Sequence, residues 1–501
     1  MPNELNHTKR EKERNQTMYD AFLNLILAIS DAMYSYILII MLLGVGLYFT
    51  LRGKLLQLRL LPESIRVVGE KTGDENSVSA FEALMVSTAS RVGTGNIVGV
   101  ANAIAVGGYG AVFWMWLIAI VGGASAFVES TLAQIYKKKD PKGGSYGGPS
   151  YYIEAALHSR VLGVIFAVVL IATYAGGFNM VASFNLLDSF TSYAFYEQAG
   201  YVTLGGGTYS VVTLVGGGVL ALLVAVCVLG GGKRIVKVTG VLVPVMGVLY
   251  ILMALVVMVL NLNMIPSVLG RIFHDAFDFQ AIFGGAVGFG SSAIMQGIKR
   301  GLYSNEAGVG SAPNAAAAAS VSHPVKQGLV QMLSVFIDTI LVCTATAMMC
   351  LSTGVDISSG LNGAPLVQAS LATTFGSVGP YFITFALLLF AFTTLLGNLF
   401  YCEGCLNYIA GRTLQNRTLN VFRIIACVLV FVGGQLEFGL VWNLADVLMG
   451  CMAIINLPVI VILGGTAMRA LQDYAQQRKE GKNPVFKASS IGLKQKTDFW
   501  N

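Results

Sequence analysis

Long apolar stretches recur along almost the whole of this 501-residue chain, with only short polar segments between them. A helix needs about 20 mostly apolar residues to cross the hydrocarbon core of a bilayer. About eleven segments meet that requirement and are predicted transmembrane helices: residues 26–50, 81–106, 110–136, 161–192, 210–231, 235–262, 278–298, 325–353, 377–403, 419–436 and 439–470. Only 12% of the residues are charged, against about 25% in a soluble domain. The sequence therefore predicts an all-α polytopic membrane protein.

The apolar segments form one predicted transmembrane domain over residues 26–470. A polar N-terminal tail, residues 1–25, precedes this domain, and a tail of residues 471–501 follows it. The first 25 residues lack the short apolar core and small-residue cleavage site of a signal peptide, so the first helix is expected to be retained. The net charge of +6 comes from basic residues in loops and tails, which does not indicate a nucleic-acid partner.

Lys and Arg residues concentrate in alternate loops and in the C-terminal tail. Because cytoplasmic loops of membrane proteins are enriched in these residues, the pattern predicts a multi-pass protein of the cell membrane with a cytoplasmic C-terminus. Eleven helices then place the N-terminus outside. The basic residues between Lys9 and Arg14 argue against that placement, although Glu11 and Glu13 lie among them.

A helix break is predicted inside the second span, at residues 90–96 (SRVGTGN). Two glycines, a threonine and an asparagine propagate a helix poorly, and irregular backbone at membrane depth occurs only against protein or a wet cavity. Such a break frees N–H groups for an anion and C=O groups for a cation. The alternative is close helix packing through the small residues Gly95 and Gly99.

A second break is predicted in the seventh span, at residues 284–292 (GGAVGFGSS). The two interrupted helices, the second and the seventh span, are five places apart and run in opposite directions. Paired interruptions in two inverted halves are typical of secondary transporters. We therefore expect two inverted five-helix repeats, residues 81–262 and 278–470, and one extra N-terminal helix, residues 26–50.

Adjacent hydroxyls at Thr393 and Thr394 lie within the ninth span. Such hydroxyls often bond back to the carbonyl four residues earlier. The functional alternative is an oxygen site for sodium shared with carbonyls of the first break, since hard cations prefer oxygen ligands.

Three stretches resemble the alanine/glycine:cation symporter family. They are residues 107–122 (GGYGAVFWMWLIAIVG), 93–101 (GTGNIVGVA) and 300–313 (RGLYSNEAGVGSAP). The first is similar to the family's diagnostic pattern, and the resemblance runs from about residue 30 to 470. It implies a fold like that of the bacterial leucine transporter, with two inverted five-helix repeats around a central site.

The resemblance also implies roles for individual residues. Substrate-binding residues would be Thr94, Gly95 and Asn96 on one side, Gly285, Gly288, Phe289 and Ser291 on the other, and Asn398 after Gly397. The amides of Thr94 and Gly95 would hold the substrate carboxylate. Sodium would be bound through Ser90, Val92, Thr393 and Thr394. Some family members have Trp where this chain has Asn398, so the pocket could admit a substrate larger than alanine.

Arg91 at the first break and Glu306 after the second are candidate gating residues. Arg91 could instead extend towards the membrane interface, and Glu306, placed in an inner loop, could instead cap a helix. Charges inside a membrane usually have partners. The candidate partners of Arg91 are Glu129, Asp338, Glu403 and Asp446, and the sequence does not choose among them.

The sequence thus predicts symport of a small neutral amino acid, alanine or glycine, with sodium by alternating access. Sodium would be co-transported rather than act as a catalytic cofactor, and the other partner is the lipid bilayer. Alternatives are a larger amino acid or proton coupling, although no carboxylate lies within either predicted break. A channel is a different class, whose pore would need rings of charge or carbonyls. The pair of breaks favours a transporter instead. No recognisable catalytic set supports an enzyme.

Overall fold

The computed structural model describes residues 18–70, 78–141, 144–204, 207–277 and 293–501. Within these ranges nine helices are long and apolar enough to cross a membrane. They are Met18–Arg52, Gly110–Ile135, Arg160–Ser192, Val211–Val228, Gly232–Leu260, Pro324–Leu351, Val378–Ala410, Asn416–Gly433 and Phe438–Lys479. The chain is therefore a mostly helical, multi-pass membrane protein, as predicted.

Several of these long helices consist of two or more shorter segments, and short helices lie between them. In chain order the helices are α2 (Leu38–Arg52), α3 (Leu56–Arg59), α4 (Leu61–Val68), α5 (Ala80–Arg91), α6 (Val98–Gly107), α7 (Gly110–Ile135), α8 (Pro149–Leu157), α9 (Arg160–Ile171), α10 (Asn179–Asp188), α11 (Ala194–Gln198), α12 (Val211–Val228), α13 (Gly232–Leu260), α14 (Ile265–Ala276), α17 (Ala293–Asn305), α18 (Pro313–Ala318), α19 (Pro324–Val335), α20 (Thr344–Leu351), α21 (Gly363–Phe375), α22 (Val378–Ala410), α23 (Asn416–Gly433) and α24 (Phe438–Lys479). Two short antiparallel hairpins, β1 (Lys138–Lys139) with β2 (Ser145–Tyr146) and β3 (Tyr201–Leu204) with β4 (Gly207–Ser210), lie in loops.

The helix predicted at 81–106 is interrupted. Its first half, α5, begins at a capping box in which Ser79 and Glu82 bond reciprocally, which satisfies amides that the first turn leaves free. The half ends at Arg91, and α6 resumes at Val98. Between them runs a short 3₁₀ turn, Thr94–Asn96. The predicted break is present.

A second interruption lies between α17 and α18, at residues 306–312. Glu306, Gly308 and Gly310 have positive φ angles of 53°, 82° and 92°, which a helix does not tolerate. Pro313 restarts the chain as the first residue of α18, where a missing amide proton has no cost. The predicted break at 284–292 lies outside the described residues. Glu306, which was predicted to lie in an inner loop, lies between α17 and α18, and its side chain is 0% exposed.

The described residues contain three π-helical segments: Met33–Ile37 before α2, Ala172–Phe178 between α9 and α10, and Phe336–Cys343 between α19 and α20. The last two lie near the breaks. A π-segment widens the helix locally and is frequent at functional sites. The segment before α20 packs on α17 and on the 3₁₀ turn. The segment before α10 packs on α22 and α24, and its Phe178 ring contacts the ring of Tyr303 near the end of α17. They bring polar residues against the two breaks.

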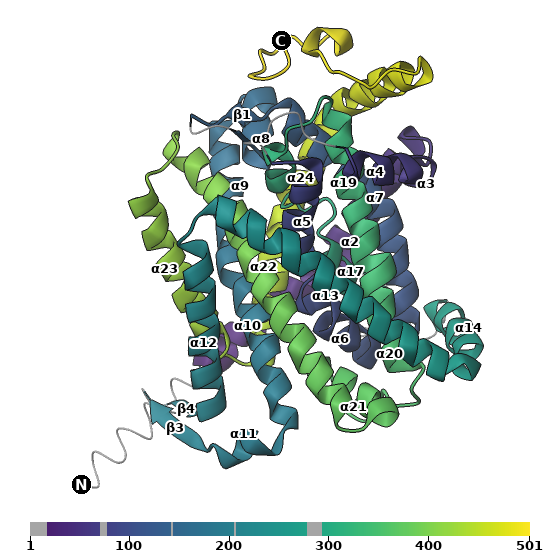
Figure 1. Ribbon diagram of the computed structural model, residues 1–501, viewed down its shortest axis with the longest axis vertical. Helices are drawn as coiled ribbons and strands as arrows, with labels where there is room; N and C mark the ends of the chain where they lie inside the picture. The colour runs from purple at the N-terminus through teal and green to yellow at the C-terminus, as the bar shows by residue number, and fades with distance from the viewer. Residues whose placement is uncertain (1–17, 71–77, 142–143, 205–206, 278–292) are drawn as a thin grey trace.

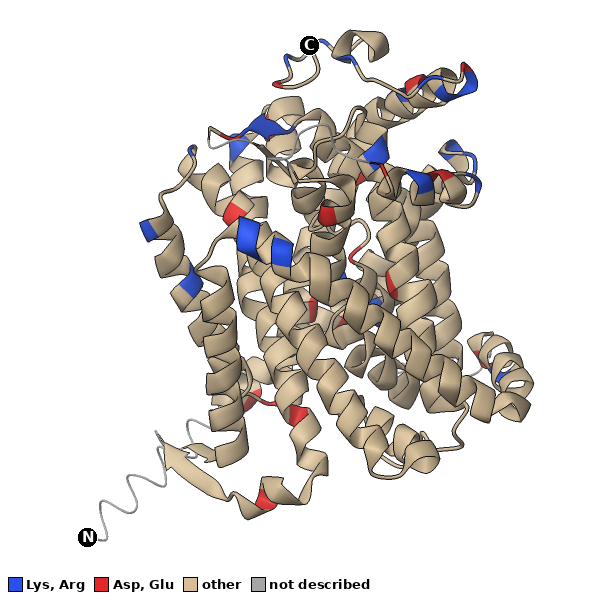
Figure 2. Cartoon of the chain, viewed as in Figure 1, with Lys and Arg blue, Asp and Glu red and all other residues tan. Residues whose placement is uncertain are grey.

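The two ends of the helical bundle differ in charge. Figure 1 shows α3, α4, α8 and the C-terminal segment at one end, and α11, α14 and the β3–β4 hairpin at the other. Most Lys and Arg residues gather towards the end that carries the C-terminus (Figure 2), here called the basic end. By the positive-inside rule the basic end is predicted to be cytoplasmic.

A buried charge cluster joins α17 to α24. Arg300 forms two bonds with Asp446, of 3.0 and 3.2 Å, and Lys299 lies 3.0 Å from the same carboxylate. The three side chains are at most 7% exposed. Removing one partner of a buried pair leaves uncompensated charge.

We expect Asp446→Asn to destabilise the protein by about 3–5 kcal/mol, because two buried cations lose their carboxylate. The measurement is thermal unfolding of purified protein in detergent. The matched control is Glu480→Gln, which breaks the exposed pair with Lys482 and should leave the melting temperature unchanged. Equal melting temperatures for both variants would contradict the assigned role of Asp446.

Candidate functional site

The two interruptions face each other in the middle of the protein. Ser90 at the end of α5 lies 3.1 Å from the Glu306 carboxylate, and Asn96 donates to the Ser304 hydroxyl at 2.9 Å. A side chain at Gly95 would come within 2.6 Å of the Tyr303 ring. The last turn of α17 therefore packs directly on the first break, which needs glycine at position 95.

The first break leaves part of its backbone available. The amide of Gly93 is bonded by the Asn96 side chain, and the amides of Asn96 and Ile97 bond to the carbonyls of Gly93 and Thr94. Within the described part of the chain, the amides of Thr94 and Gly95 donate no hydrogen bond. Because a buried amide without a partner is rare, these two are the donors available to an anionic ligand such as a carboxylate.

Asn96 has several bonds within the protein. Its Nδ2 donates to Asp338 Oδ1 at 2.6 Å, and its backbone carbonyl accepts from Thr346 at 2.7 Å. Ser304 donates to the other oxygen of Asp338, also at 2.6 Å. Asp338, in the π-segment after α19, thus joins both interrupted helices. The predicted contact of Asn96 with substrate remains a prediction.

The two threonines of α22 differ in orientation. Thr394 Oγ1 lies 3.1 Å from the carbonyl of Ala89 in α5. It is also the atom that a Cβ atom added at Gly93 would meet first. Thr393 bonds back to Leu389 and Phe390 in its own helix. Thr394, not Thr393, therefore places a hydroxyl oxygen against the first break.

The remaining predicted sodium and pocket residues also lie at the break. Val92 is 2% exposed, and its amide donates to the Thr88 carbonyl. The Ser90 hydroxyl lies 2.6 Å from Asn398 Oδ1, and Asn398 Nδ2 donates to Asn179 in α10. Asn398 is 0% exposed, so it joins the first break to α10. Gly285, Gly288, Phe289 and Ser291 lie outside the described residues.

Arg91 is buried beside the second break. Its guanidinium donates to the backbone and side-chain oxygens of Gln331 in α19, while Nε and Nη2 have no partner in the described residues. Of its four candidate partners, two are committed elsewhere: Glu403 pairs with Arg423 and Asp446 with Arg300. Glu129 and Asp338 interact with Arg91 electrostatically, as does Glu306.

Carboxylates also hold the second break. Glu306 Oε2 accepts from the Ser311 hydroxyl at 2.5 Å. Glu129 in α7 accepts from the Gly308 amide at 3.3 Å and from Asn456 Nδ2 at 2.8 Å. Asn456 also donates to the Gly308 carbonyl. These contacts fix the irregular backbone in place of helical hydrogen bonds.

An aromatic group that the sequence reasoning missed lies next to the available amides. The Tyr303 ring lies 4.5 Å from that of Phe178 and 4.6 Å from that of Trp442, centroid to centroid. Trp442 Nε1 donates to Asn185, whose amide donates to the Thr94 hydroxyl. The sequence signal for the second break, which follows Tyr303, was the pair Gly308 and Gly310 followed by Pro313.

A helical membrane protein with two facing interruptions, available backbone amides and nearby hydroxyl and carbonyl oxygens is a secondary transporter by its architecture. Its overall fold resembles that of MhsT in complex with L-phenylalanine, with a TM-score of 0.54 at 15% identity over 79% of this chain and 92% of that one. The fold is therefore that of the leucine-transporter-like proteins.

The chain belongs to the sodium:alanine symporter family, whose model matches residues 19–488. It is 44% identical to the amino-acid carrier protein AlsT of Bacillus subtilis, over 95% of this chain and 97% of the relative. It is also 44% identical to the probable sodium/glutamine symporter GlnT of the same organism, over 91% of each chain. The protein is thus a symporter and not an enzyme.

We expect Gly95→Ala to lower the initial rate of substrate transport about tenfold or more, because the new methyl group overlaps the Tyr303 ring and overpacking costs about 1–3 kcal/mol. Uptake by reconstituted protein is the measurement. Gly176→Ala is the control, since nothing lies within 4 Å of a side chain at that position. Similar rates for both variants would rule out the close packing of Tyr303 on the break.

Proposed function

We propose that this protein transports a small neutral amino acid, alanine or glycine, together with sodium by alternating access between the two sides of the cell membrane. The observation that carries the proposal is the first break. It offers two available amides at Thr94 and Gly95 beside the Thr394 hydroxyl and the Ala89 carbonyl. Oriented amides suit a carboxylate, and uncharged oxygens suit a hard monovalent cation.

Substrate and sodium would each stabilise the conformation of the first break that binds the other. Sodium between α5 and α22 would fix the Gly93 region, and this region orients the neighbouring amides. A zwitterionic substrate would then place its carboxylate on the amides of Thr94 and Gly95 and its side chain towards Tyr303 and Trp442. Linkage requires that each ligand raise the affinity of the other by the same factor.

Rocking of one part of the bundle against the other would open the site alternately to each side, with the C-terminus in the cytoplasm and the N-terminus outside. Arg91 and Glu306 would contribute to closing the basic end. Both are buried at the contact between the two breaks, where separation of α5 from α18 must disrupt their surroundings.

Proton coupling is a second candidate. Neither predicted break contains a carboxylate, but Glu306 begins the interruption at 306–312, with Glu129 and Asp338 close by. A proton on one of these groups could replace or accompany sodium. The sodium proposal is favoured by the family and by the uncharged oxygens at Thr394.

The first test is uptake of labelled alanine and glycine into proteoliposomes, with an inward sodium gradient, with choline in its place, and with a proton gradient alone. Sodium-dependent accumulation that alanine inhibits better than glutamine is expected. Uptake driven by a proton gradient without sodium would favour the second candidate. Stronger inhibition by glutamine than by alanine would assign the larger substrate.

We expect Thr394→Val to raise the sodium concentration for half-maximal transport about tenfold, because one oxygen ligand worth about 1–3 kcal/mol is lost without a change of shape. Thr393→Val is the matched control and should change this value little, since its hydroxyl bonds within α22. Sodium activation of alanine uptake is measured for each variant. An effect at Thr393 that exceeds the effect at Thr394 would overturn the assignment.

A further inference from the structure

The chain after α24 returns over the basic end of the molecule. We call residues 480–501 the C-terminal strap. Although it is short and carries little regular structure, several of its side chains are buried: Phe486 is 3% exposed and Trp500, the penultimate residue, 7%. The backbone amide of Ala488 donates to the Trp500 carbonyl, and the two rings pack at 5.6 Å. The strap therefore forms a closed, packed segment.

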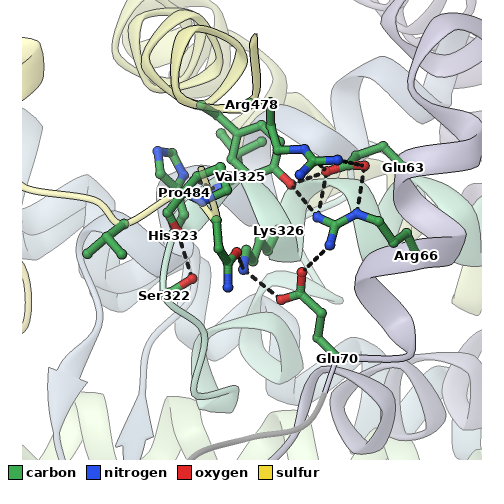
Figure 3. Close-up of polar contacts among 12 residues, drawn as sticks. Glu63, Arg66, Glu70, Ser322, His323, Val325, Lys326, Arg478 and Pro484 are labelled. Atoms are coloured by element: carbon green, nitrogen blue, oxygen red, sulfur yellow. Dashed lines mark hydrogen bonds and ion pairs between the residues drawn. The ribbon is translucent and has the colours of Figure 1, made fainter. Parts of the chain in front are cut away.

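The strap binds the linker between α18 and α19, residues 319–323. The Phe486 amide donates to the Ser322 carbonyl at 2.9 Å, and the Ser322 hydroxyl donates to the Pro484 carbonyl at 2.8 Å (Figure 3). Lys326, the third residue of α19, donates to Asn483 Oδ1 at 2.8 Å. This linker directly follows the half-helix α18. The strap therefore holds the second broken helix at the basic end of the molecule.

His323 lies at the centre of this contact. Its ring packs on Tyr474 at 5.1 Å and Phe486 at 5.0 Å. Burial lowers the pKa of His323 to about 4, so the ring is neutral at physiological pH. Its Nδ1 accepts from the Val325 amide, which leaves Nε2–H to donate to Asp473 in α24.

The strap also binds the end of α7. Trp500 Nε1 donates to the Gln134 carbonyl at 2.8 Å. Lys137 lies beneath the rings of Phe499 and Trp500, at 4.6 and 5.3 Å, and donates to the Ala319 carbonyl at 2.8 Å. Removal of the strap would expose this lysine to water and weaken the connection between α7 and the linker.

The linker in turn fixes the start of the first broken helix. Ser320 donates its amide to the Val78 carbonyl at 2.8 Å, and Val78 directly precedes the Ser79 cap of α5. Contacts therefore run from the strap through the linker to α5. The strap connects α7 and α24 to the basic-end halves of both broken helices.

Ion pairs beside the strap reinforce the same end (Figure 3). Lys326 of α19 lies 2.6 Å from Glu70, and Arg66 of α4 pairs with both Glu63 and Glu70. Arg478, the second last residue of α24, lies 3.0 Å from Glu63. These pairs join α4, α19 and α24, whereas the strap bonds the backbone of the linker after α18.

We propose that the C-terminal strap is a latch on the basic end, which holds α5 and α18 closed over the site and must release for the site to open towards that side. A path from the first break to the basic end requires separation of α5 from the linker and from α19. The strap stabilises the closed arrangement because it holds the linker where Ser320 bonds Val78 at the start of α5. The inference rests on the proposed alternating access, so its test reads conformation separately from transport.

The test places a cysteine at Thr88, which lies in α5 on the basic-end side of the break, is 3% exposed and contacts Ser334 of α19. The labelling rate of Thr88→Cys with a membrane-impermeant maleimide is measured in nanodiscs, with and without Trp500→Ala. The protein without Thr88→Cys gives the background from its seven native cysteines. We expect Trp500→Ala to accelerate labelling about fivefold or more, the size of a typical coupling.

A second variant and a control keep the test decisive. A chain ending at Gly492 retains Phe486 but lacks Trp500 and should accelerate labelling similarly. Lys494→Ala, at an exposed position of the strap, should leave the rate unchanged. Unchanged labelling in both strap variants, with melting temperatures that show folded protein, would overturn the proposal. Absence of alanine uptake by the parent protein would count against the proposed function and leave the labelling result interpretable.

Discussion

The structure depends on the requirement that interrupted backbone inside a bilayer be satisfied by protein. Each unpaired amide or carbonyl in hydrocarbon costs several kcal/mol, and within the described residues helical hydrogen bonds stop at the two breaks, 92–97 and 306–312. Side chains replace them. Asn96 bonds the Gly93 amide at the first break, and Glu129 and Asn456 bond Gly308 at the second. The amides of Thr94 and Gly95 stand out because the surrounding groups are bonded.

The same requirement explains why so many polar residues are buried between the breaks. Asp338 accepts from Asn96, Ser304 and Thr339, so one carboxylate orients groups from three helices. Fully bonded polar networks are rigid and tolerate little rearrangement. A rigid centre lets the two ends of the bundle move relative to each other while the binding geometry is preserved.

Much of the architecture could be predicted from the sequence, because apolar length and basic loops are one-dimensional signals. The first break was also predictable, since Gly93 and Gly95 lie within an otherwise apolar helix. The break at 306–312 was not recognised, although Gly308, Gly310 and Pro313 are explicit signals. The sequence predicted only an inner loop at Glu306, and the fold shows that α17 ends at the first break and not at the membrane surface.

Side-chain pairing was beyond the sequence for a different reason. Arg91 had four plausible carboxylate partners, and the choice depends on which helices are neighbours. The structure gives two of them to other cations, Asp446 to Arg300 and Glu403 to Arg423. The orientation of Thr393 and Thr394 is equally three-dimensional, since adjacent residues on a helix point about 100° apart and only one can face α5.

The contacts on the two sides of the site differ in kind, and this difference bears on the proposed alternating access. Beside Trp442, the contact between elements depends on the pair of Arg300 in α17 and Asp446 in α24. At the basic end it depends on short segments, the α18–α19 linker and the C-terminal strap, joined by backbone hydrogen bonds and two buried rings. Short segments with few contacts open locally at lower cost than packed helices. A terminal strap can therefore detach without disturbing the polar network at the breaks, whereas separation of Arg300 from Asp446 must move α17 and, with it, Tyr303 and Ser304 against the first break.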